Sequence, residues 1–305
     1  MSLYAVTGAS GHLGRLVVEE LLDRGVSPSE VVCVVRTPSK VQDLRRRGLE
    51  IRMGDYGDPE TLKDAFADVS SVLLVSSSEH GNRVPHHTNV IEAARAAGVE
   101  RIAYTGLLNT DGTSNLLVGE HQGTEEVLRR SGVPFTLLRN GWYIENYTDQ
   151  LGRYLALGAI FGAAGAGKVS AASRSDYAAA AAAALLADDK QTDVVYELGG
   201  PAFNLSELAQ IITEVTGTQV VYRDLTVEQY TDALLKGGLD ESTARFVAAL
   251  DAVIAVGDLE TDSDDLVRLI GRPVTPVAEV VTAAASRFAA VPASNRGAGQ
   301  LAAAV

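Results

Sequence analysis

The chain has 305 residues, of which 46% are hydrophobic and 21% are charged, and this composition indicates a globular protein of one or two domains. Its formal net charge of −13 disfavours a nucleic-acid-binding surface, which requires clustered positive charge. The single cysteine, Cys33, excludes a disulfide within the chain, and no apolar run is long enough to span a bilayer. Because Met1 leads directly into a strand pattern, we expect no signal peptide and a cytoplasmic protein without membrane or nucleic-acid partners.

The first predicted elements are a strand over residues 3–7 and a helix over residues 13–25, joined by a glycine-rich turn. In such a unit the first glycine makes the turn, the second admits a pyrophosphate, and the third lets the helix pack closely on the strand. The N-terminus of the helix adds free N–H groups and a partial positive charge. The residues that we expect to contact a dinucleotide here are Thr7, Gly8, Ser10, Gly11, His12, Leu13 and Gly14.

The second predicted strand, residues 31–36, ends in Arg36, where a carboxylate would bind the ribose 2′-hydroxyl of NADH. An arginine at this position favours the 2′-phosphate of NADPH instead. The alternative is a solvated basic helix, because Arg45, Arg46 and Arg47 continue the positive charge. The place of Arg36 at a strand end favours NADPH as the cofactor.

Strand and helix signals alternate through the first half of the chain and predict a parallel sheet built from βαβ units. The remaining strands of this sheet are expected at residues 49–53, 71–76, 100–105, 133–139 and 194–198. Helices are expected near residues 38–47, 59–67, 84–97, 118–131, 204–217, 227–236, 241–256 and 277–289, with an alanine-rich helix capped by Asp176. The fold class is therefore α/β, a Rossmann-type doubly wound parallel sheet with a smaller, mostly helical C-terminal substrate lobe.

Two parts of the chain should enclose a substrate cleft. We expect an NADP-binding domain over residues 1–155 and 175–198, and a substrate-binding lobe over 156–174 and 199–288. Residues 289–305 are rich in alanine and glycine without an apolar period, which predicts a disordered tail.

Ligands of open α/β sheets bind beyond the carboxyl ends of the strands. Ser76, Ser77 and Ser78 follow the fourth strand and are small enough to let the backbone approach a ribose or a pyrophosphate. Arg83 could reach a phosphate or form a surface ion pair, and both interpretations stay open. Asp55 follows the third strand and could accept a hydrogen bond from the adenine amine.

The end of the sixth strand should face the nicotinamide. Asn140, Trp142 and Tyr143 follow this strand, and Trp142 is the sole tryptophan of the chain. Tyr143 and Tyr147 are one helical turn apart. These aromatic side chains either fill a core or form a platform for an aromatic substrate.

The chain lacks the Tyr-x-x-x-Lys pair with which ordinary short-chain dehydrogenases protonate an alkoxide. This absence disfavours alcohol–ketone exchange and favours an electron-poor acceptor such as a quinone, a flavin-like ring or a cationic dye. His121 could donate a proton, although its polar neighbours predict an exposed helix start. The candidate catalytic residues are therefore Tyr143 and His121.

The sequence predicts no metal site. The acidic run from Asp258 to Asp265 lacks the glycine and the final glutamate of a calcium loop. His86 and His87 are adjacent on a predicted helix and therefore point in different directions.

Several segments together resemble one protein family. They are TGASGHLG, SSSEHGNR, YTGLL, LLRNGWYIENY, GAAGAGKVSAASRSDYAAAAA and LIGRP. The chain resembles the type 2 NADPH:quinone oxidoreductases, of the NmrA-like branch of atypical short-chain dehydrogenases, alongside the triphenylmethane dye reductases. The resemblance extends from Leu3 to about Phe288, and His12 stands where a glutamine is often found.

The resemblance implies a cytosolic monomer or homodimer that uses NADPH. It implies that a quinone enters between the corner at 140–143 and the segment at 162–173. The substrate contacts that it implies are Trp142, Tyr143, Asn146, Tyr147, Phe161 and Arg174. For Arg174 the alternative is an ion pair with Asp176 at a helix start.

Two functions remain open from the sequence. The first is an NADPH-dependent oxidoreductase that transfers hydride to a quinone or a similar electron-poor aromatic acceptor. The second is a non-catalytic NADP(H)-binding redox sensor of the NmrA type, which the missing Tyr/Lys pair keeps possible. The aromatic, glycine-walled region beside the nicotinamide corner favours the enzyme.

Overall fold

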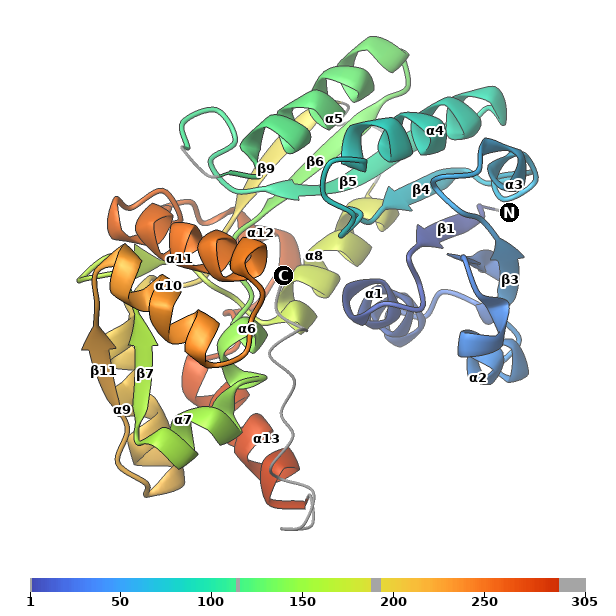
Figure 1. Cartoon of the computed structure of the whole chain (residues 1–305). Coiled ribbons are helices and arrows are strands. Elements are labelled where there is room, and N and C mark those ends of the chain that lie inside the picture. The colour runs from blue at the N-terminus through green and yellow to red at the C-terminus, as the bar shows by residue number, and fades with distance from the viewer. Residues whose placement is uncertain (1, 114–115, 188–192, 291–305) are drawn as a thin grey trace.

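The computed structural model describes residues 2–113, 116–187 and 193–290, and its centre is a seven-stranded, fully parallel sheet (Figure 1). In chain order its strands are β1 (Tyr4–Thr7), β2 (Val31–Val35), β3 (Glu50–Met53), β4 (Ser71–Leu74), β5 (Arg101–Leu107), β6 (Phe135–Asn140) and β9 (Val194–Leu198). Their spatial order is β3-β2-β1-β4-β5-β6-β9, so the direction of winding reverses between β1 and β4. The α/β doubly wound fold is confirmed.

Helices cover both faces of this sheet. Successive strand residues point to opposite sides, so each strand contributes apolar side chains to a core on each face. In β2, Cys33 and Val35 pack on one face, and Val32 and Val34 pack on the other. The first face carries α1 (His12–Asp23), α2 (Gln42–Arg46), α8 (Arg174–Leu186) and α12 (Asp265–Ile270). The second face carries α3 (Pro59–Lys63), α4 (Arg83–Ala96) and α5 (Val118–Ser131).

A second group of elements forms a lobe beside the sheet, with a hydrophobic core of its own (Figure 1). Its helices are α6 (Glu145–Thr148), α7 (Leu151–Leu157), α9 (Leu205–Thr216), α10 (Val227–Lys236), α11 (Glu241–Ala255) and α13 (Val277–Ala290). It also holds two small sheets, in which β7 (Ala159–Gly162) pairs with β11 (Val221–Asp224) and β8 (Lys168–Val169) pairs with β10 (Phe203–Asn204). The sequence pattern did not reveal these short strands.

Three parts of the expected division of the chain can be compared with the structure. α6 and α7, placed in the first part by the sequence pattern, pack in the core of the lobe. α12, placed in the lobe, packs on α8 and β9 of the main sheet. Of the expected disordered tail, residues 289 and 290 end α13, and residues 291–305 lie outside the described residues.

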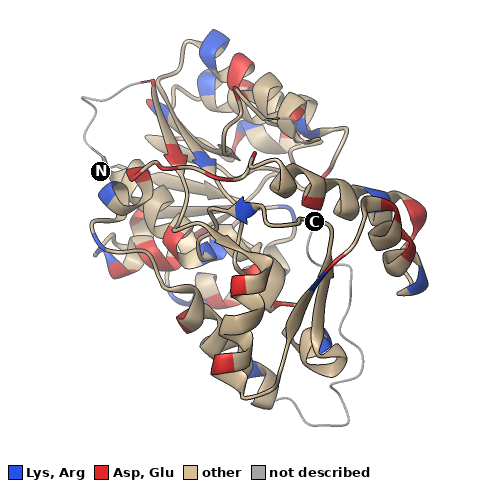
Figure 2. Cartoon of the chain, turned by 90° about the vertical axis from the view of Figure 1, so that its left-hand side faces the viewer, with Lys and Arg blue, Asp and Glu red and all other residues tan. Residues whose placement is uncertain are grey.

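Charge is dispersed over the molecule rather than gathered. On the side of the chain shown in Figure 2, acidic and basic residues are interspersed along the ribbon. Within the described residues, the helices are all too short or too polar to cross a membrane. The same residues contain no cluster of three or more histidine, cysteine or acidic side chains suited to a metal ion.

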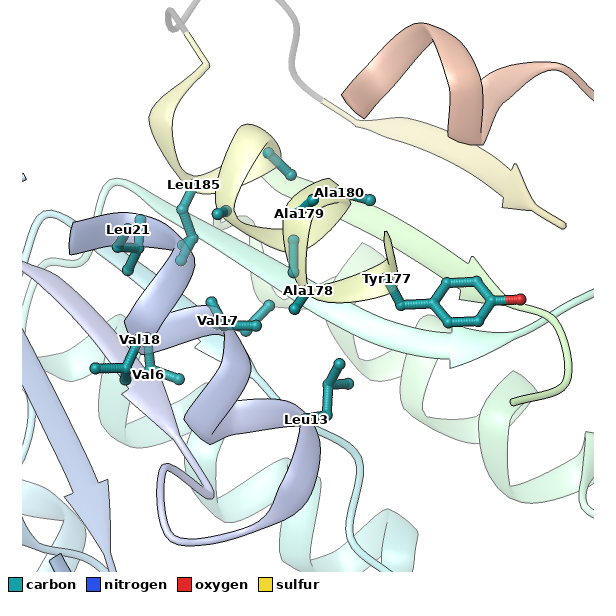
Figure 3. Close-up of a cluster of buried hydrophobic side chains, with 14 of the residues drawn as sticks. Val6, Leu13, Val17, Val18, Leu21, Tyr177, Ala178, Ala179, Ala180 and Leu185 are labelled. Atoms are coloured by element: carbon teal, nitrogen blue, oxygen red, sulfur yellow. The ribbon is translucent and has the colours of Figure 1, made fainter. Parts of the chain in front are cut away.

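The alanine-rich helix α8 lies directly on α1 (Figure 3). Val17 and Leu21 of α1 face Ala178 and Leu185 of α8, and the small alanine side chains let the two helices approach closely. The expected cap of α8 is wrong. Ser173 is the N-cap and accepts a hydrogen bond from the Asp176 backbone N–H, because the helix begins at Arg174.

Candidate functional site

A cavity of about 500 Å³ lies at the carboxyl edge of the main sheet. Residues at the carboxyl ends of β1 to β6 line it, including those of β1 and β4, between which the strand order reverses. Open α/β sheets bind their ligands at such a point. From the lobe, Asn146 of α6 and Phe246 and Leu250 of α11 also line the cavity.

The glycine-rich turn lines this cavity and leads into α1. Gly8 has a φ of +61°, which a side chain would strain, and a Cβ on Gly14 would overlap the Gly8 carbonyl oxygen. Gly11 is the N-cap of α1, no side chain caps the helix, and its first turn carries no acidic residue. The backbone N–H groups at this helix N-terminus are therefore available to an anion.

Six of the seven residues predicted in the turn are positioned at or beside the cavity, and Thr7 is not. Gly8, Ser10, Gly11, His12, Leu13 and Gly14 line the cavity. Thr7 is fully buried, and its hydroxyl donates to the Leu73 carbonyl and accepts from the Val75 N–H and from the Tyr56 hydroxyl. Thr7 therefore ties β1 to β4 beneath the turn.

One end of the cavity carries a cation. The Arg36 guanidinium is 63% exposed at the end of β2, and its Nη1 lies 2.6 Å from the Glu79 carboxylate. Asp55 lines the same end and accepts a hydrogen bond from the Gly57 N–H at 2.9 Å. Arg36 is thus held beside the cavity by an exposed counter-ion.

The loop after β4 forms the middle of the cavity wall. Ser76, Ser77 and Ser78 all line it, and the Ser76 hydroxyl oxygen is buried without a hydrogen-bond partner in the described chain. Arg83 fixes this loop by donating to the Ser77 carbonyl at 2.9 Å and to the Glu120 carboxylate at 2.7 Å. Arg83 does form an ion pair, with Glu120, but its side chain is buried rather than on the surface.

The other end of the cavity is aromatic. Asn140, Trp142 and Tyr143 line it, and the Tyr143 ring lies between the edge of Tyr177, at 5.3 Å, and the Arg174 guanidinium, at 5.3 Å. Burial raises the pKa of Tyr143, so this hydroxyl keeps its proton at neutral pH. The Asn140 Oδ1 and the Trp142 Nε1 are buried without hydrogen-bond partners among the described residues.

Asn146 and Arg174 also line this end and bond to each other, with Nη2 of the guanidinium 3.2 Å from the Asn146 Oδ1. The suggested ion pair of Arg174 with Asp176 does not form. Arg174 pairs with Asp149 and Asp176 pairs with Arg272.

Two residues expected at the substrate are not brought to this cavity. Tyr147 is buried in the core of the lobe with its ring 6.2 Å from that of Phe203. Phe161 lies on β7 and lines a separate cavity of about 170 Å³ together with Tyr154 and Tyr230. No residue of β7 lines the main cavity, which the glycine-rich sequence around this strand did not reveal.

His121 differs most from its expected environment. The sequence predicted an exposed helix start, but the side chain is 5% exposed and lines the cavity. Burial, followed by the positive charge of Arg83, lowers the pKa of His121 to about 3. The next residue, Gln122, is exposed, while the Nδ1 of His121 lies 2.7 Å from the hydroxyl of Tyr104 of β5.

Sequence reasoning missed several wall residues. Phe246, Leu250, Leu117 and His80 also line the cavity, and the Phe246 ring lies 5.4 Å from that of His80. Phe246 and Leu250 are four residues apart and so share a helix face, which was the available signal. The sequence alone does not show which loop this helix face covers, because that depends on tertiary packing.

The arrangement suits an elongated, phosphorylated ligand. An uncapped helix N-terminus lies in the middle, a cation lies at one end, and an aromatic pocket with two unpartnered buried polar atoms lies at the other.

Comparisons with known proteins agree with this geometry. A family model described as NAD(P)H-binding matches residues 8–188. Quinone oxidoreductase 2 of Escherichia coli (strain K12) is 44% identical over 281 residues, which cover 92% of this chain and 98% of the relative. The crystal structure of an E. coli NADPH-dependent quinone oxidoreductase complexed with NADPH matches with a TM-score of 0.88 and 44% identity, over 92% of this chain and 99% of that chain. The triphenylmethane reductase of Citrobacter sp., complexed with NADP(H), matches with a TM-score of 0.88 and 38% identity, over 92% and 99%.

Proposed function

Because the chain belongs to the NAD(P)H-binding family, we propose that it is an NADPH-dependent oxidoreductase that reduces a quinone or a similar electron-poor aromatic acceptor. One observation carries the proposal. A single cavity joins the uncapped N-terminus of α1 and Arg36 to an apolar, aromatic end walled by Trp142, Tyr143 and Phe246. The relatives named for quinone and dye reduction support the same acceptor class.

The residues present fit the dinucleotide. Gly8 to Leu13 and the first turn of α1 would hold the pyrophosphate, and Arg36 would hold the 2′-phosphate. The unpartnered Ser76 hydroxyl and Asn140 Oδ1 would each gain a polar partner, which removes the cost of burying them alone. Asn140 is suited to the amide of the nicotinamide, because its free oxygen can accept an N–H.

The residues of the chain then act mainly by positioning the acceptor beside the cofactor. NADPH supplies the hydride when bound. Trp142, Tyr143, Phe246 and Leu250 exclude water and hold a flat acceptor against the aromatic end. Tyr143 has a raised pKa and none of the tyrosines has a lysine four residues later, so no tyrosine acts as a strong acid. An acceptor that is already electron-poor does not require one.

We also propose the division of labour between the two parts. The main sheet with α1 to α5 and α8 binds the dinucleotide, and the lobe supplies the acceptor wall through α11. The separate cores of the sheet and of the lobe support this division, with α12 grouped with the sheet.

The test is consumption of NADPH, followed by its absorbance, as benzoquinone is added to the purified protein. We expect turnover that saturates with benzoquinone and exceeds a blank without protein. A parallel measurement of NADPH binding by calorimetry separates the alternatives. Tight binding without consumption would contradict the enzyme and favour the redox sensor.

A further inference from the structure

The environment of His121 suggests a specific role in the cavity. His121 lies in the first turn of α5 and lines the cavity together with Asn140, Tyr143 and Leu117. Its side chain is therefore available to a ligand at the aromatic end.

The two ring nitrogens of His121 have different surroundings. Nδ1 lies 2.7 Å from the Tyr104 hydroxyl. Nε2 has no protein partner in the described chain, and it is not sealed within the protein as the unpartnered Trp142 Nε1 is. Nε2 therefore opens toward the cavity that the side chain lines.

The hydrogen bonds of the neighbouring His87 determine which of its two ring nitrogens carries the proton. The Ser77 N–H donates to the His87 Nε2 at 2.9 Å, so the proton of neutral His87 lies on Nδ1. This Nδ1 lies 2.9 Å from the Thr124 hydroxyl, which itself donates to the Glu120 carbonyl at 3.0 Å. The hydrogen bonds of His87 are thus complete without the Tyr104 hydroxyl, although its ring packs edge-on at 5.4 Å from Tyr104.

The charges that face His121 keep it neutral. Arg83 of α4 and His80 of the preceding loop oppose a positive charge on the imidazole, and burial opposes it more strongly. Glu120 is adjacent in the chain but pairs with Arg83 at 2.7 Å. Burial also raises the pKa of Tyr104, so the Tyr104–His121 pair holds its protons over the ordinary pH range.

We propose that Tyr104 donates its hydroxyl proton to Nδ1 of neutral His121, which leaves the imidazole proton on Nε2, and that this Nε2–H donates a hydrogen bond to the carbonyl oxygen of the bound acceptor. The inference rests on the proposed quinone reduction. His121 is then a catalytic residue that touches the acceptor, and Tyr104 is a positioning residue that sets its tautomer.

The chemistry balances without a proton from the histidine. Hydride addition brings two electrons to the acceptor ring and places negative charge on its carbonyl oxygen. The Nε2–H bond stabilises this charge and stays intact, since its loss would leave an imidazolate. The reduced product takes its proton from water. A donor that is fixed in place before the reaction stabilises developing charge without reorganisation.

The kinetic test compares His121→Leu with His121→Gln, because the glutamine amide can place an N–H near the position of Nε2. We expect His121→Leu to lower kcat for benzoquinone by about 100-fold, the scale reported for removing one such donor, with NADPH affinity unchanged. His121→Gln should recover most of kcat. The matched control is Gln122→Leu, the next residue of α5, whose side chain bonds the Thr110 carbonyl. It should leave kcat unchanged.

Two further measurements do not depend on turnover by the variants. Nitrogen-15 NMR of the wild-type protein should show the His121 proton on Nε2, and Tyr104→Phe should make both tautomers visible. The wild-type kcat should be constant from pH 5 to pH 8.

Three results would overturn the inference: His121→Leu with wild-type kcat, a proton on Nδ1 in the NMR spectrum, or an acidic limb near pH 6.5 that His121→Gln abolishes. Failure of the wild-type protein to consume NADPH would instead refute the proposed function. The tautomer would still be measurable in that case.

Discussion

In the proposed NADPH site Arg36 would contact the 2′-phosphate, and its ion pair with Glu79 would oppose that contact. The two side chains are 63% and 43% exposed and their ion pair spans 2.6 Å at the edge of the cavity. An exposed pair of this kind contributes little stability, so a phosphate can take the guanidinium from Glu79 at small cost. In the proposed site Glu79 would therefore compete with the 2′-phosphate for Arg36.

We expect Arg36→Glu to weaken NADPH binding by about 2 kcal/mol, the scale of a lost charge-assisted phosphate contact, and NADH binding far less. Glu79→Gln should strengthen NADPH binding several-fold, because it removes the competing carboxylate. Calorimetric titration with both dinucleotides at one salt concentration measures these changes. Arg45→Glu makes the same charge change on α2, outside the cavity, and serves as the control.

An equal loss for NADPH and NADH in Arg36→Glu would show that the 2′-phosphate binds elsewhere. An unchanged NADPH affinity in Glu79→Gln would show that the ion pair does not compete with the phosphate.

At the scale of elements, the N-terminus of α8 is tied to the loop that precedes α13. Asp176 is fully buried, and its carboxylate accepts from Arg272 at 2.7 Å, from the Thr275 N–H at 3.0 Å, and from the hydroxyls of Thr275 and Ser173. This loop joins α12, which packs on the main sheet, to α13, which packs in the lobe. A single carboxylate thus links the two parts.

We expect Asp176→Asn to lower the free energy of unfolding by about 3 kcal/mol, because the amide N–H₂ replaces an acceptor oxygen and leaves buried donors unpaired. Urea denaturation at pH 7 measures the change. The exposed Asp262→Asn carries the same substitution on the surface and should change stability by less than about 0.5 kcal/mol. Similar losses in both variants would contradict a linking role for Asp176.

The elements also show where sequence reasoning succeeds. The strands of the main sheet and the helices between them were predicted to within a few residues, because each carries its own apolar pattern and its own glycine or proline boundary. The strands β7, β8, β10 and β11 were not predicted, because they are two to four residues long and too short to show alternation.

The candidate site divides in the same way. The glycine-rich turn and the strand ends were predicted because position at a strand end is a local property. The burial of His121 and the approach of Phe246 to His80 were not, because Tyr104, Arg83 and α11 come from distant parts of the chain. Contacts of this kind have no local pattern.

At the scale of the whole molecule, three buried titratable groups with large pKa shifts contribute to the response of stability to mild acid. Burial, with the charge of Arg83 second, lowers the pKa of His87 to about 3, as it does that of His121. Their folded-state pKa values lie below the unfolded value of about 6.5, so the unfolded chain binds more protons as the pH falls from about 6.5 toward 3. Each histidine therefore removes on the order of 1.4 kcal/mol of stability per pH unit in this window.

Asp251 acts in the opposite sense. Burial raises its pKa to about 6, against an ordinary value of 3.8, so the folded chain binds the extra proton between these values. Stability from this group rises as the pH falls through about 6. The two histidines lower the free energy of unfolding as the pH falls from 6 to 4.5, and the one carboxyl raises it. The net change is therefore about the loss that one histidine alone would cause.

The melting temperature should therefore fall as the pH is lowered from 6 to 4.5, and single substitutions should change the slope in opposite directions. His121→Gln removes one histidine and should make the profile nearly flat, since His87 and Asp251 then cancel. Asp251→Asn removes the opposing carboxyl and should make the profile about twice as steep. Thermal denaturation of the three proteins in one buffer series measures the slopes. If His121→Gln left the acid slope unchanged, the imidazole would not be neutral in the folded chain, and the hydrogen-bond pattern assigned to the Tyr104–His121 pair would be wrong with it.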